Sequence, residues 1–260
     1  MSTYSIQNLF SIKGKTALVT GGSRGIGLMI AQAYVENGVK VYISSRKAEV
    51  CDAVAAELSK LGECISIPAD LSSAEGRAVL VNGIKEKEES LDILVNNAGA
   101  AWAAPFGKFP ESGYDKTMDI NVKAIFMLTQ ELLPLLEKGA STTNPARIIN
   151  IGSIDGIRVP ELDNFSYGPS KAAVHHLTKV LAVRLGRKGI TVNAIAPGPF
   201  ESKMTEYVME HFKKEVEAGC PMGRIGNPQD MAGMAVYLAS PAASYVTGTV
   251  IPLDGGICIA

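Results

Sequence analysis

The sequence predicts an α/β fold: a doubly wound, mostly parallel sheet of about seven strands, covered by helices on both faces in three α/β/α layers. Two observations predict it. Short apolar runs alternate with longer helical stretches along the 260 residues, which is typical of repeated βαβ units. A glycine-rich turn at residues 21–27 follows the first apolar run and precedes the first helix. No change of composition marks a linker, so we expect a single domain over residues 1–260.

Each element is predicted from the length of its run and from the residues that end it; Gly38, for example, is a good stop signal for the first helix. The predicted strands are residues 16–20, 39–44, 64–69, 91–95, 146–151, 190–195 and 250–253. The predicted helices are residues 28–37, 51–61, 72–87, 114–138, 167–186 and 231–238. Two long departures from the alternation, residues 154–166 and 199–226, are expected to carry function because they lie on a rigid scaffold.

Composition narrows the class of protein. Apolar residues make up 47% and charged residues 20% of the chain, which permits a large core and argues against disorder. A net charge of −1 gives no reason to expect nucleic acid or an anionic membrane as a partner. The four scattered cysteines form no C-x-x-C pair, so neither a disulfide framework nor a metal site is expected. No signal peptide or membrane-spanning run is seen, and we expect a cytoplasmic protein.

The glycine-rich turn predicts a dinucleotide site and makes the predicted fold Rossmann-type. Glycines 21, 25 and 27 permit positive φ angles and a close approach of the backbone to a pyrophosphate. Free N–H groups at the start of the helix would bind the anion. A glycine-rich sequence alone indicates only a tight turn, but here it lies between a strand and a helix, as such a site requires. The residues assigned to it are Gly21, Ser23, Arg24, Gly25, Ile26 and Gly27.

The end of the second strand favours NADPH/NADP⁺ over NAD. An NAD site normally has a carboxylate there to bind the ribose 2′-hydroxyl, whereas residues 43–47 read Ile-Ser-Ser-Arg-Lys. Arg46 and Arg24 are the right groups to bind a 2′-phosphate, and Ser45 would add a hydroxyl donor. The alternative is a solvated basic turn.

Tyr167 and Lys171 form the candidate catalytic pair. Four residues apart on a helix, they share one face, and a cation close to the phenol is expected to lower its pKa. The phenol would then donate a proton to a ketone oxygen as hydride arrives. Ser153, just after a predicted strand, would donate a hydrogen bond to the same oxygen. Tyr-x-x-x-Lys pairs alone are common at surfaces, so the assignment depends on the glycine turn and Ser153.

Taken together, these residues resemble the short-chain dehydrogenase/reductase family over nearly the whole chain. The matching segments are Thr20-Gly21-x-x-x-Gly25-x-Gly27, Asn96-Asn97-Ala98-Gly99, Ser153, Tyr167-x-x-x-Lys171 and Pro197-Gly198. One departure is a loop between Ser153 and Tyr167 about one residue longer than is commonest in this family, which bears on substrate shape.

The resemblance implies a role for each motif. Tyr167 is similar to the family's general acid, Lys171 to the residue that binds the nicotinamide ribose, and Ser153 to the one that orients the substrate. Asn121 resembles the residue that holds a proton-relay water. The remaining residues resemble cofactor contacts: Asp70 with Leu71 at the adenine, Asn97, Ala98 and Gly99 at the adenosine ribose, Ile195, Pro197 and Gly198 at the nicotinamide, and Ser202 at its carboxamide.

Within the family, the chain resembles 3-oxoacyl-(acyl carrier protein) reductases, including the rhamnolipid-pathway type. This likeness implies NADPH-dependent reduction of a 3-oxoacyl or β-keto compound to a secondary alcohol. One alternative is an NAD(P)-dependent secondary-alcohol, polyol or sugar dehydrogenase. Another is a non-catalytic nucleotide-sensing protein, although such proteins typically lose the tyrosine or the lysine. The family commonly forms tetramers through the C-terminal end, so a homotetramer or dimer is expected, and an acyl carrier protein is a possible partner.

The substrate residues are the least determined by the sequence. Trp102 is a candidate for the pocket wall, with packing as the alternative. Phe200 and Met204 begin an apolar series that continues through residues 207, 208 and 212. The series predicts either a lid over the substrate or an amphipathic helix lying on the core. His175 and His176 have no metal-ligand spacing, and surface or interface positions are expected for both.

Overall fold

The computed structural model describes residues 4–160, 162–203 and 205–260. Its seven strands form one sheet in the order β3-β2-β1-β4-β5-β6-β7, and every neighbouring pair is parallel. The strands are β1 Thr16–Thr20, β2 Lys40–Ser44, β3 Cys64–Ser66, β4 Ile93–Asn96, β5 Ala146–Ile151, β6 Ile190–Pro197 and β7 Val250–Leu253. The predicted α/β fold is therefore confirmed.

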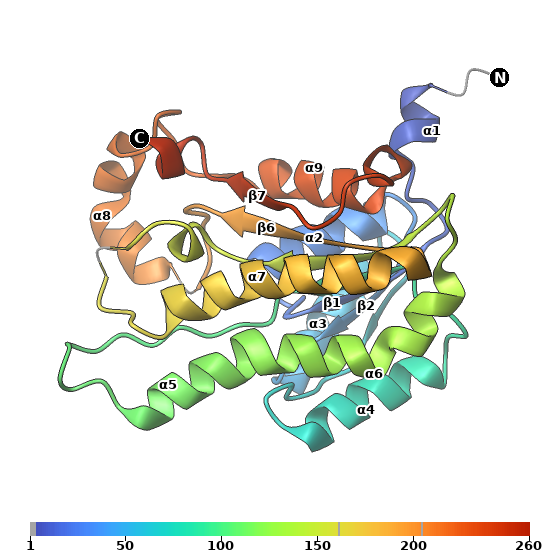
Figure 1. Cartoon of the computed structure of the whole chain (residues 1–260), viewed down its shortest axis with the longest axis horizontal. Helices are drawn as coiled ribbons and strands as arrows, with labels where there is room; N and C mark the ends of the chain where they lie inside the picture. Colours follow the sequence, from blue (N-terminus) through green and yellow to red (C-terminus); the bar gives the residue numbers. More distant parts are fainter. Residues whose placement is uncertain (1–3, 161, 204) are drawn as a thin grey trace.

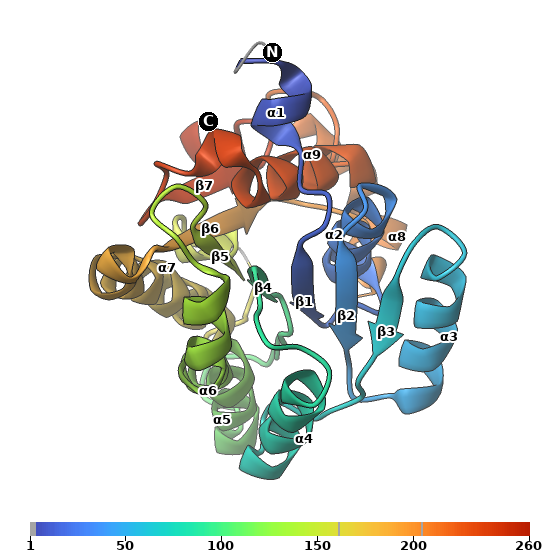
Figure 2. The same ribbon diagram turned by 90° about the vertical axis from the view of Figure 1, so that its right-hand side faces the viewer.

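Helices cover both faces of the sheet (Figure 2), so the central strands are buried and mostly apolar, and every residue of β5 and β6 is buried. Helices α2, α3 and α9 pack on one face, and α4, α6 and α7 on the other. The helices are α1 Ile6–Phe10, α2 Gly25–Glu36, α3 Ala48–Leu58, α4 Ala74–Lys85, α5 Glu111–Met118, α6 Ala124–Gly139, α7 Tyr167–Leu185, α8 Glu206–Ala218 and α9 Pro228–Ala239. None of the helices within the described residues is long and apolar enough to cross a bilayer.

Apart from shifts of a few residues at the ends of several elements, the structure differs from the predicted elements in three places. The helix expected at residues 114–138 is two helices, α5 and α6, joined by a π-helical turn at Asp119–Lys123. Helix α2 begins at Gly25, three residues before the predicted start at residue 28. Of glycines 21, 25 and 27, only Gly21 and Gly25 have a positive φ, so the helix can begin within the glycine-rich sequence. Helix α1, of five residues, was not expected, and a helix in the region of α8 was only one of two alternatives for the apolar series there. Both helices lie outside the βαβ alternation.

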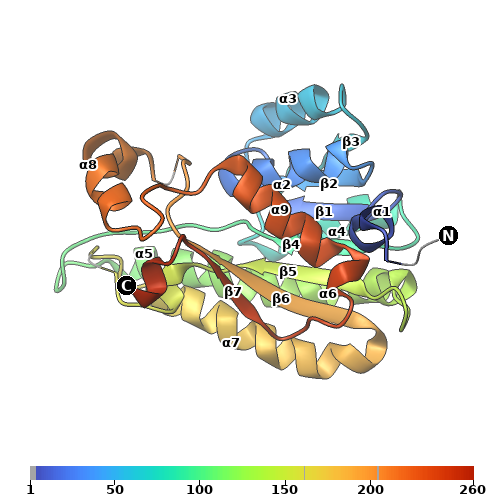
Figure 3. The ribbon, with the colours of Figure 1, turned by 90° about the horizontal axis from the view of Figure 1, so that it is seen from above.

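The order of the strands determines where a ligand can bind. The chain progresses outward from β1 to β3 and then returns to place β4 on the other side of β1. Loops diverge at such a reversal and leave a crevice at the carboxyl ends of the two strands. Helix α8 and the C-terminus lie at one end of the molecule and the N-terminus at the other (Figures 1 and 3).

Candidate active site

The predicted site residues gather at the carboxyl edge of the sheet. The glycine turn follows β1, Asn97-Ala98-Gly99 follow β4, Ser153 follows β5, and Gly198 follows β6. Because all strands are parallel, these segments end on the same edge. Two of them, after β1 and β4, flank the crevice where the strand order reverses.

The glycine turn has the shape of an anion cradle. Gly21 and Gly25 have φ angles of 65° and 52°, which L side chains rarely adopt. A Cβ atom on Gly27 would lie 2.3 Å from the carbonyl oxygen of Gly21, so no larger residue fits. Arg24 precedes α2 without capping it through its side chain. The amides of the first helical turn are therefore available to a phosphate, and the turn fits a pyrophosphate. Ser23 and Ile26 are buried and half-buried parts of the same turn.

Asn97 fastens this turn to β4. Its Nδ2 donates hydrogen bonds to the carbonyl oxygens of Thr20 (2.9 Å) and Gly21 (3.2 Å). The Thr20 hydroxyl in turn accepts hydrogen bonds from the backbone N–H groups of Asn97 and Ala98. The amide of Asn97 is thus occupied inside the protein, and any contact of this segment with a ribose falls to its backbone and to Gly99. Thr20 is part of the motif quoted from the sequence, but its hydrogen bonds with Asn97 and Ala98 were not predicted.

The expected 2′-phosphate site carries unpaired positive charge. Arg24 and Arg46 are exposed, and neither forms an ion pair or hydrogen bond with another described residue. Burial would raise the pKa of Asp70, but hydrogen bonds from Ser72 and the charges of Arg46 and Lys116 outweigh it and hold the pKa below its ordinary value. Arg46 therefore lies close enough to Asp70 for their charges to interact.

Ser45 and Leu71 contribute less than the sequence indicated. The Ser45 hydroxyl oxygen is buried beside the thiol of Cys51, so it does not face the surface that carries Arg46. The Leu71 side chain is packed in the core. Its carbonyl oxygen accepts a hydrogen bond from Arg77 at 3.2 Å. Of the polar groups of Leu71, the backbone N–H is therefore the one left to contact an adenine.

Tyr167, Lys171 and Ser153 come together as predicted. The Nζ atom of Lys171 lies 5.5 Å from the centre of the Tyr167 ring and donates a hydrogen bond to the carbonyl oxygen of Ile151 at 2.8 Å. Ser153 stands two residues beyond Ile151 and lies close enough to the phenol to act on its pKa. Its hydroxyl oxygen also accepts a hydrogen bond from the N–H group of Asp155 at 3.1 Å.

In the protein without cofactor, the pKa of Tyr167 is raised and not lowered, contrary to what its spacing from Lys171 predicted. Burial raises the pKa of Tyr167 to about 12; the hydrogen bond with Ser153 opposes this, and the negative charge of Asp155 adds to it. The ammonium group lies over the ring and is directed to Ile151. Burial also lowers the pKa of Lys171 to about 8. At neutral pH the phenol keeps its proton and the lysine keeps its charge.

Asn121 is fully buried in the π-helical turn. Its Oδ1 accepts a hydrogen bond from the Ala100 N–H, and its Nδ2 donates to the Ala100 carbonyl and the Ser170 hydroxyl, all at 2.9 Å. The Ser170 hydroxyl continues to the carbonyl oxygen of Tyr167 at 2.7 Å. The side chain thus ties the segment after β4 to the start of α7. A relay water would need another group, such as a backbone carbonyl of the turn.

The segment after β6 faces the glycine turn. The N–H group of Gly198 donates to the carbonyl oxygen of Leu253 at 2.9 Å, and Pro197 and Ile195 are buried. A Cβ atom on Gly25 would lie 3.1 Å from the Cβ of Ser202. Ser202 is therefore placed beside Gly25 of the glycine turn.

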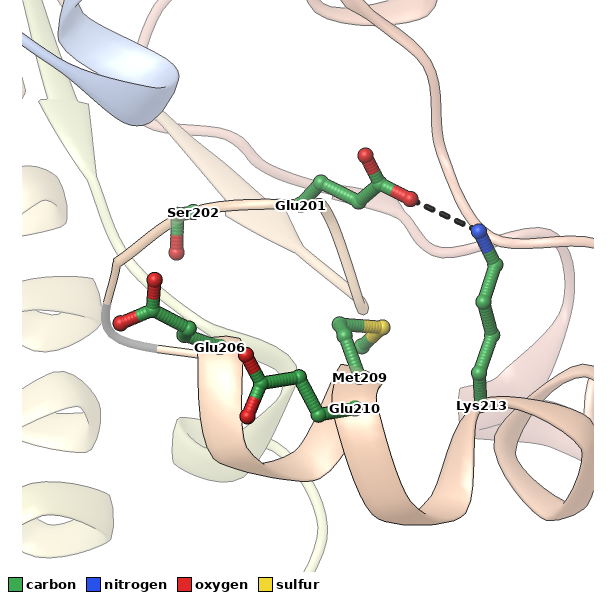
Figure 4. A pocket seen from close by; sticks show the side chains of 6 residues that line it. All are labelled: Glu201, Ser202, Glu206, Met209, Glu210 and Lys213. Carbon is green, nitrogen blue, oxygen red and sulfur yellow. Dashed lines mark hydrogen bonds and ion pairs between the residues drawn. The ribbon is translucent and has the colours of Figure 1, made fainter.

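A cavity of about 320 Å³ lies between α8 and the segment that leads into it (Figure 4). Three carboxylates line it, and Glu201 is paired with Lys213 at 2.7 Å. The other lining residues are Ser202, Glu206, Met209 and Glu210. The cavity borders the cofactor side of the site; Tyr167 does not line it. None of the α8 side chains that the structure describes is fully buried. A lid over the substrate and an amphipathic helix on the core both stay predictions.

The substrate assignments change in the structure. Phe200 is not a pocket residue: it is 2% exposed and packs on Gly226, where a Cβ would lie 2.3 Å from its ring. An aromatic ring of that size fills the core space that glycine leaves. Met204 lies outside the described residues. Trp102 packs on Gly113, with the Lys116 ammonium 5.5 Å from its ring centre, which favours its packing role.

Two residues near the catalytic group were missed or misplaced. Asp155 is half-buried, and its charge acts on Tyr167; only its position two residues after Ser153 could have indicated it. His175 is buried, whereas a surface or interface position was expected. The sequence Lys-Ala-Ala-Val-His places it one helical turn beyond Lys171, on the face toward the sheet, and this spacing was the available signal. Among the described residues, no three His, Cys, Asp or Glu side chains are grouped as metal ligands.

Comparisons with known proteins agree with this geometry. Residues 21–258 match a family described as enoyl-(acyl carrier protein) reductase. The chain is 50% identical over 249 residues to a rhamnolipids biosynthesis 3-oxoacyl-(acyl-carrier-protein) reductase of Pseudomonas aeruginosa, covering 95% of this chain and 97% of the relative. It is 35% identical to the 3-oxoacyl-(acyl-carrier-protein) reductase FabG of Chlamydia trachomatis, covering 94% and 97%. Its structure matches the Pseudomonas aeruginosa RhlG/NADP active-site complex with a TM-score of 0.94 and 49% identity, covering 97% and 99%.

Proposed function

The chain belongs to the short-chain dehydrogenase/reductase family, and we propose that it reduces the ketone of a 3-oxoacyl thioester, or a related β-keto compound, to a secondary alcohol with NADPH. One observation carries the proposal. A protonated tyrosine, a serine hydroxyl and a buried lysine meet beside an uncapped, glycine-lined helix N-terminus. This combination offers a proton donor, a hydrogen bond and an anion site at one edge of the sheet.

The residues fit NADPH, which supplies the hydride when bound. The turn at Gly21, Gly25 and Gly27 would hold the pyrophosphate at the start of α2. Arg24 and Arg46 would bind the 2′-phosphate, because both guanidinium groups lack a partner among the described residues and are suited to bidentate contacts. Gly99, Gly198 and Ser202 would line the two ribose and nicotinamide segments.

Side chains of the protein donate the proton to the ketone oxygen and stabilise the negative charge that develops during the reduction. As the carbonyl carbon accepts hydride, its oxygen gains negative charge and takes the proton of the Tyr167 hydroxyl, leaving a phenolate that solvent reprotonates. Ser153 donates a hydrogen bond to that oxygen; its lone pair is already engaged by the Asp155 N–H, which leaves its proton to donate. The Lys171 ammonium stabilises the phenolate.

We also propose that the enzyme is a cytoplasmic homotetramer or dimer, with an acyl carrier protein as a possible carrier of the substrate. Two observations support an assembly: the side chains of Tyr245 and Ile259, near the C-terminus, are almost completely exposed. Both side chains are available to a second copy of the chain, and burying them there would favour association. Gel filtration at the mass of a monomer would exclude the assembly, and catalysis with a carrier-free thioester would make the carrier dispensable.

The experiment that tests the proposed function follows the loss of reduced-nicotinamide absorbance with NADPH and with NADH. The substrates are a 3-oxoacyl thioester and a simple β-ketoester. Oxidation of NADPH in preference to NADH is expected, at a rate proportional to enzyme. No oxidation with either substrate, but turnover of sugars or polyols, would assign the enzyme to the oxidative dehydrogenases instead.

A further inference from the structure

His175 packs against the turn that carries the catalytic serine, Ser153. It follows Lys171 by four residues on α7, so both side chains point from one face of the helix toward the sheet. Its side chain is 7% exposed, while that of the adjacent His176 is exposed. A buried imidazole is unusual enough to need a physical reason.

Its contacts are with both ends of the turn that carries Ser153. The turn starts at Gly152 and continues through the 3-10 helix Ile154–Gly156. A Cβ on Gly152 would lie 2.2 Å from Nε2 of His175, and a Cβ on Gly156 would lie 2.8 Å from its Cε1. The imidazole therefore fills the space that the two glycines leave on either side of Ser153.

The same turn is pressed against the start of α7. A Cβ on Gly156 would also lie 2.7 Å from the backbone nitrogen of Ala172, the residue after Lys171. Backbone packing this close leaves little room for the turn to shift. The His175 ring lies between this turn and α7. It therefore sets the distance between Ser153 and the helix that carries Tyr167 and Lys171.

The imidazole is a neutral spacer. Burial, reinforced by the positive charges of Lys171 and Lys179, lowers the pKa of His175 to about 4, against a hydrogen bond with the Gly156 backbone. Its Nε2 has no hydrogen-bond partner within the described structure. The ring therefore adds no second positive charge beside Lys171 at neutral pH.

We propose that His175 is a positioning residue for the proposed ketone reduction: it holds the Ser153 hydroxyl at the correct place relative to Tyr167 without touching substrate or cofactor. This inference rests on the proposed function. It also gives the two glycines around Ser153 a purpose, since each makes room for the ring. Misplacing a catalytic group by about 1 Å can cost about 100-fold in rate, so the support behind Ser153 is expected to matter.

A double-mutant cycle with Ser153 tests the proposal. His175→Ala is expected to lower kcat by about 10- to 100-fold, with NADPH affinity unchanged. In a Ser153→Ala background, the same substitution is expected to change kcat less than about twofold, because residues that act as a unit are not additive. His175→Asn, which keeps a planar polar side chain in part of the space beside Gly152 and Gly156, should recover part of the rate. His176→Ala is the matched control and should behave as wild type.

The kcat values of the cycle and the NADPH affinities distinguish a positioning role of His175 from a role in stability alone. Equal losses of kcat with and without Ser153, or a parallel loss of NADPH affinity, would overturn the proposal. If His175→Ala does not fold, His175→Asn and His175→Gln enter the same cycle, with NADPH binding as the criterion of folding. Absence of turnover in the wild type would instead reject the proposed function, and His175→Ala would then still bind NADPH.

Discussion

The ammonium of Lys171 donates a hydrogen bond to the carbonyl oxygen of Ile151 at 2.8 Å. Ile151 is the last residue of β5, and Ser153 follows two positions later. This bond connects the helix that carries the tyrosine to the end of the strand that precedes the serine. It holds the lysine ammonium between the end of β5 and the Tyr167 ring, which becomes a phenolate during the proposed reduction.

The pH dependence of the reduction is expected to report Lys171. Because burial lowers its pKa to about 8, the lysine loses its proton and its positive charge as the pH rises through that value. Tyr167, with a pKa of about 12, stays protonated over this range. We therefore expect kcat for reduction to be level below pH 8 and to fall above it.

Lys171→Arg provides the control for that assignment. Arginine stays charged at every working pH, so this variant should be slower but should show no decline near pH 8. The measurement is a kcat profile at saturating NADPH and substrate for both proteins. A decline of the same midpoint in the arginine variant would assign it to another group.

Gly27→Ala should damage the cofactor cradle. The new Cβ would lie 2.3 Å from the Gly21 carbonyl oxygen and 2.4 Å from Nδ2 of Asn97. We expect the free energy of unfolding to fall by about 1–3 kcal/mol, as for other overpacked sites, and NADPH binding to be lost. Thermal unfolding with and without NADPH measures both effects.

Gly233 offers a matched substitution. It is exposed in the middle of α9, and among the described residues no atom lies within 4 Å of the position that a Cβ would take there. Gly233→Ala should stabilise the protein by about 0.5–1 kcal/mol through helix propensity, with NADPH binding intact. Loss of NADPH binding in this variant too would mean that the cradle geometry is not what limits binding.

Arg46→Ala should weaken NADPH selectively. Losing a charge-assisted contact to the 2′-phosphate costs about 1.5–3 kcal/mol, or about 10- to 100-fold in Kd, while NADH, which lacks that phosphate, should bind as before. Arg187→Ala, at an exposed arginine of the opposite sheet edge, is the control. Equal weakening of both cofactors by Arg46→Ala would place the 2′-phosphate elsewhere.

The sequence predicted the parts of this enzyme that depend on local patterns. The seven strands follow from apolar runs, and β1, β5 and β7 have the predicted bounds. The glycine turn, Ser153, Tyr167 and Lys171 follow from motifs in which residue type and spacing carry the chemistry. These residues meet in space because parallel strands end at one edge.

What the sequence did not predict depends on contacts between distant segments. Phe200 looks like a pocket residue until Gly226, 26 positions away in the printed sequence, is seen to receive its ring. The raised pKa of Tyr167 results from burial and from Asp155, not from the motif itself. The π-helical turn at Asn121 has the composition of an ordinary helix, and only its hydrogen bonds with Ala100 and Ser170 explain it.

The most direct test of the account is the turnover of Tyr167→Phe with NADPH and a 3-oxoacyl thioester. Removing the phenolic oxygen takes away the proton donor, so kcat should fall by about 100- to 10,000-fold, with NADPH affinity preserved. Tyr114→Phe, at an exposed tyrosine of α5, should retain full turnover. Turnover of Tyr167→Phe at the wild-type rate would contradict the assignment of Tyr167 as the general acid.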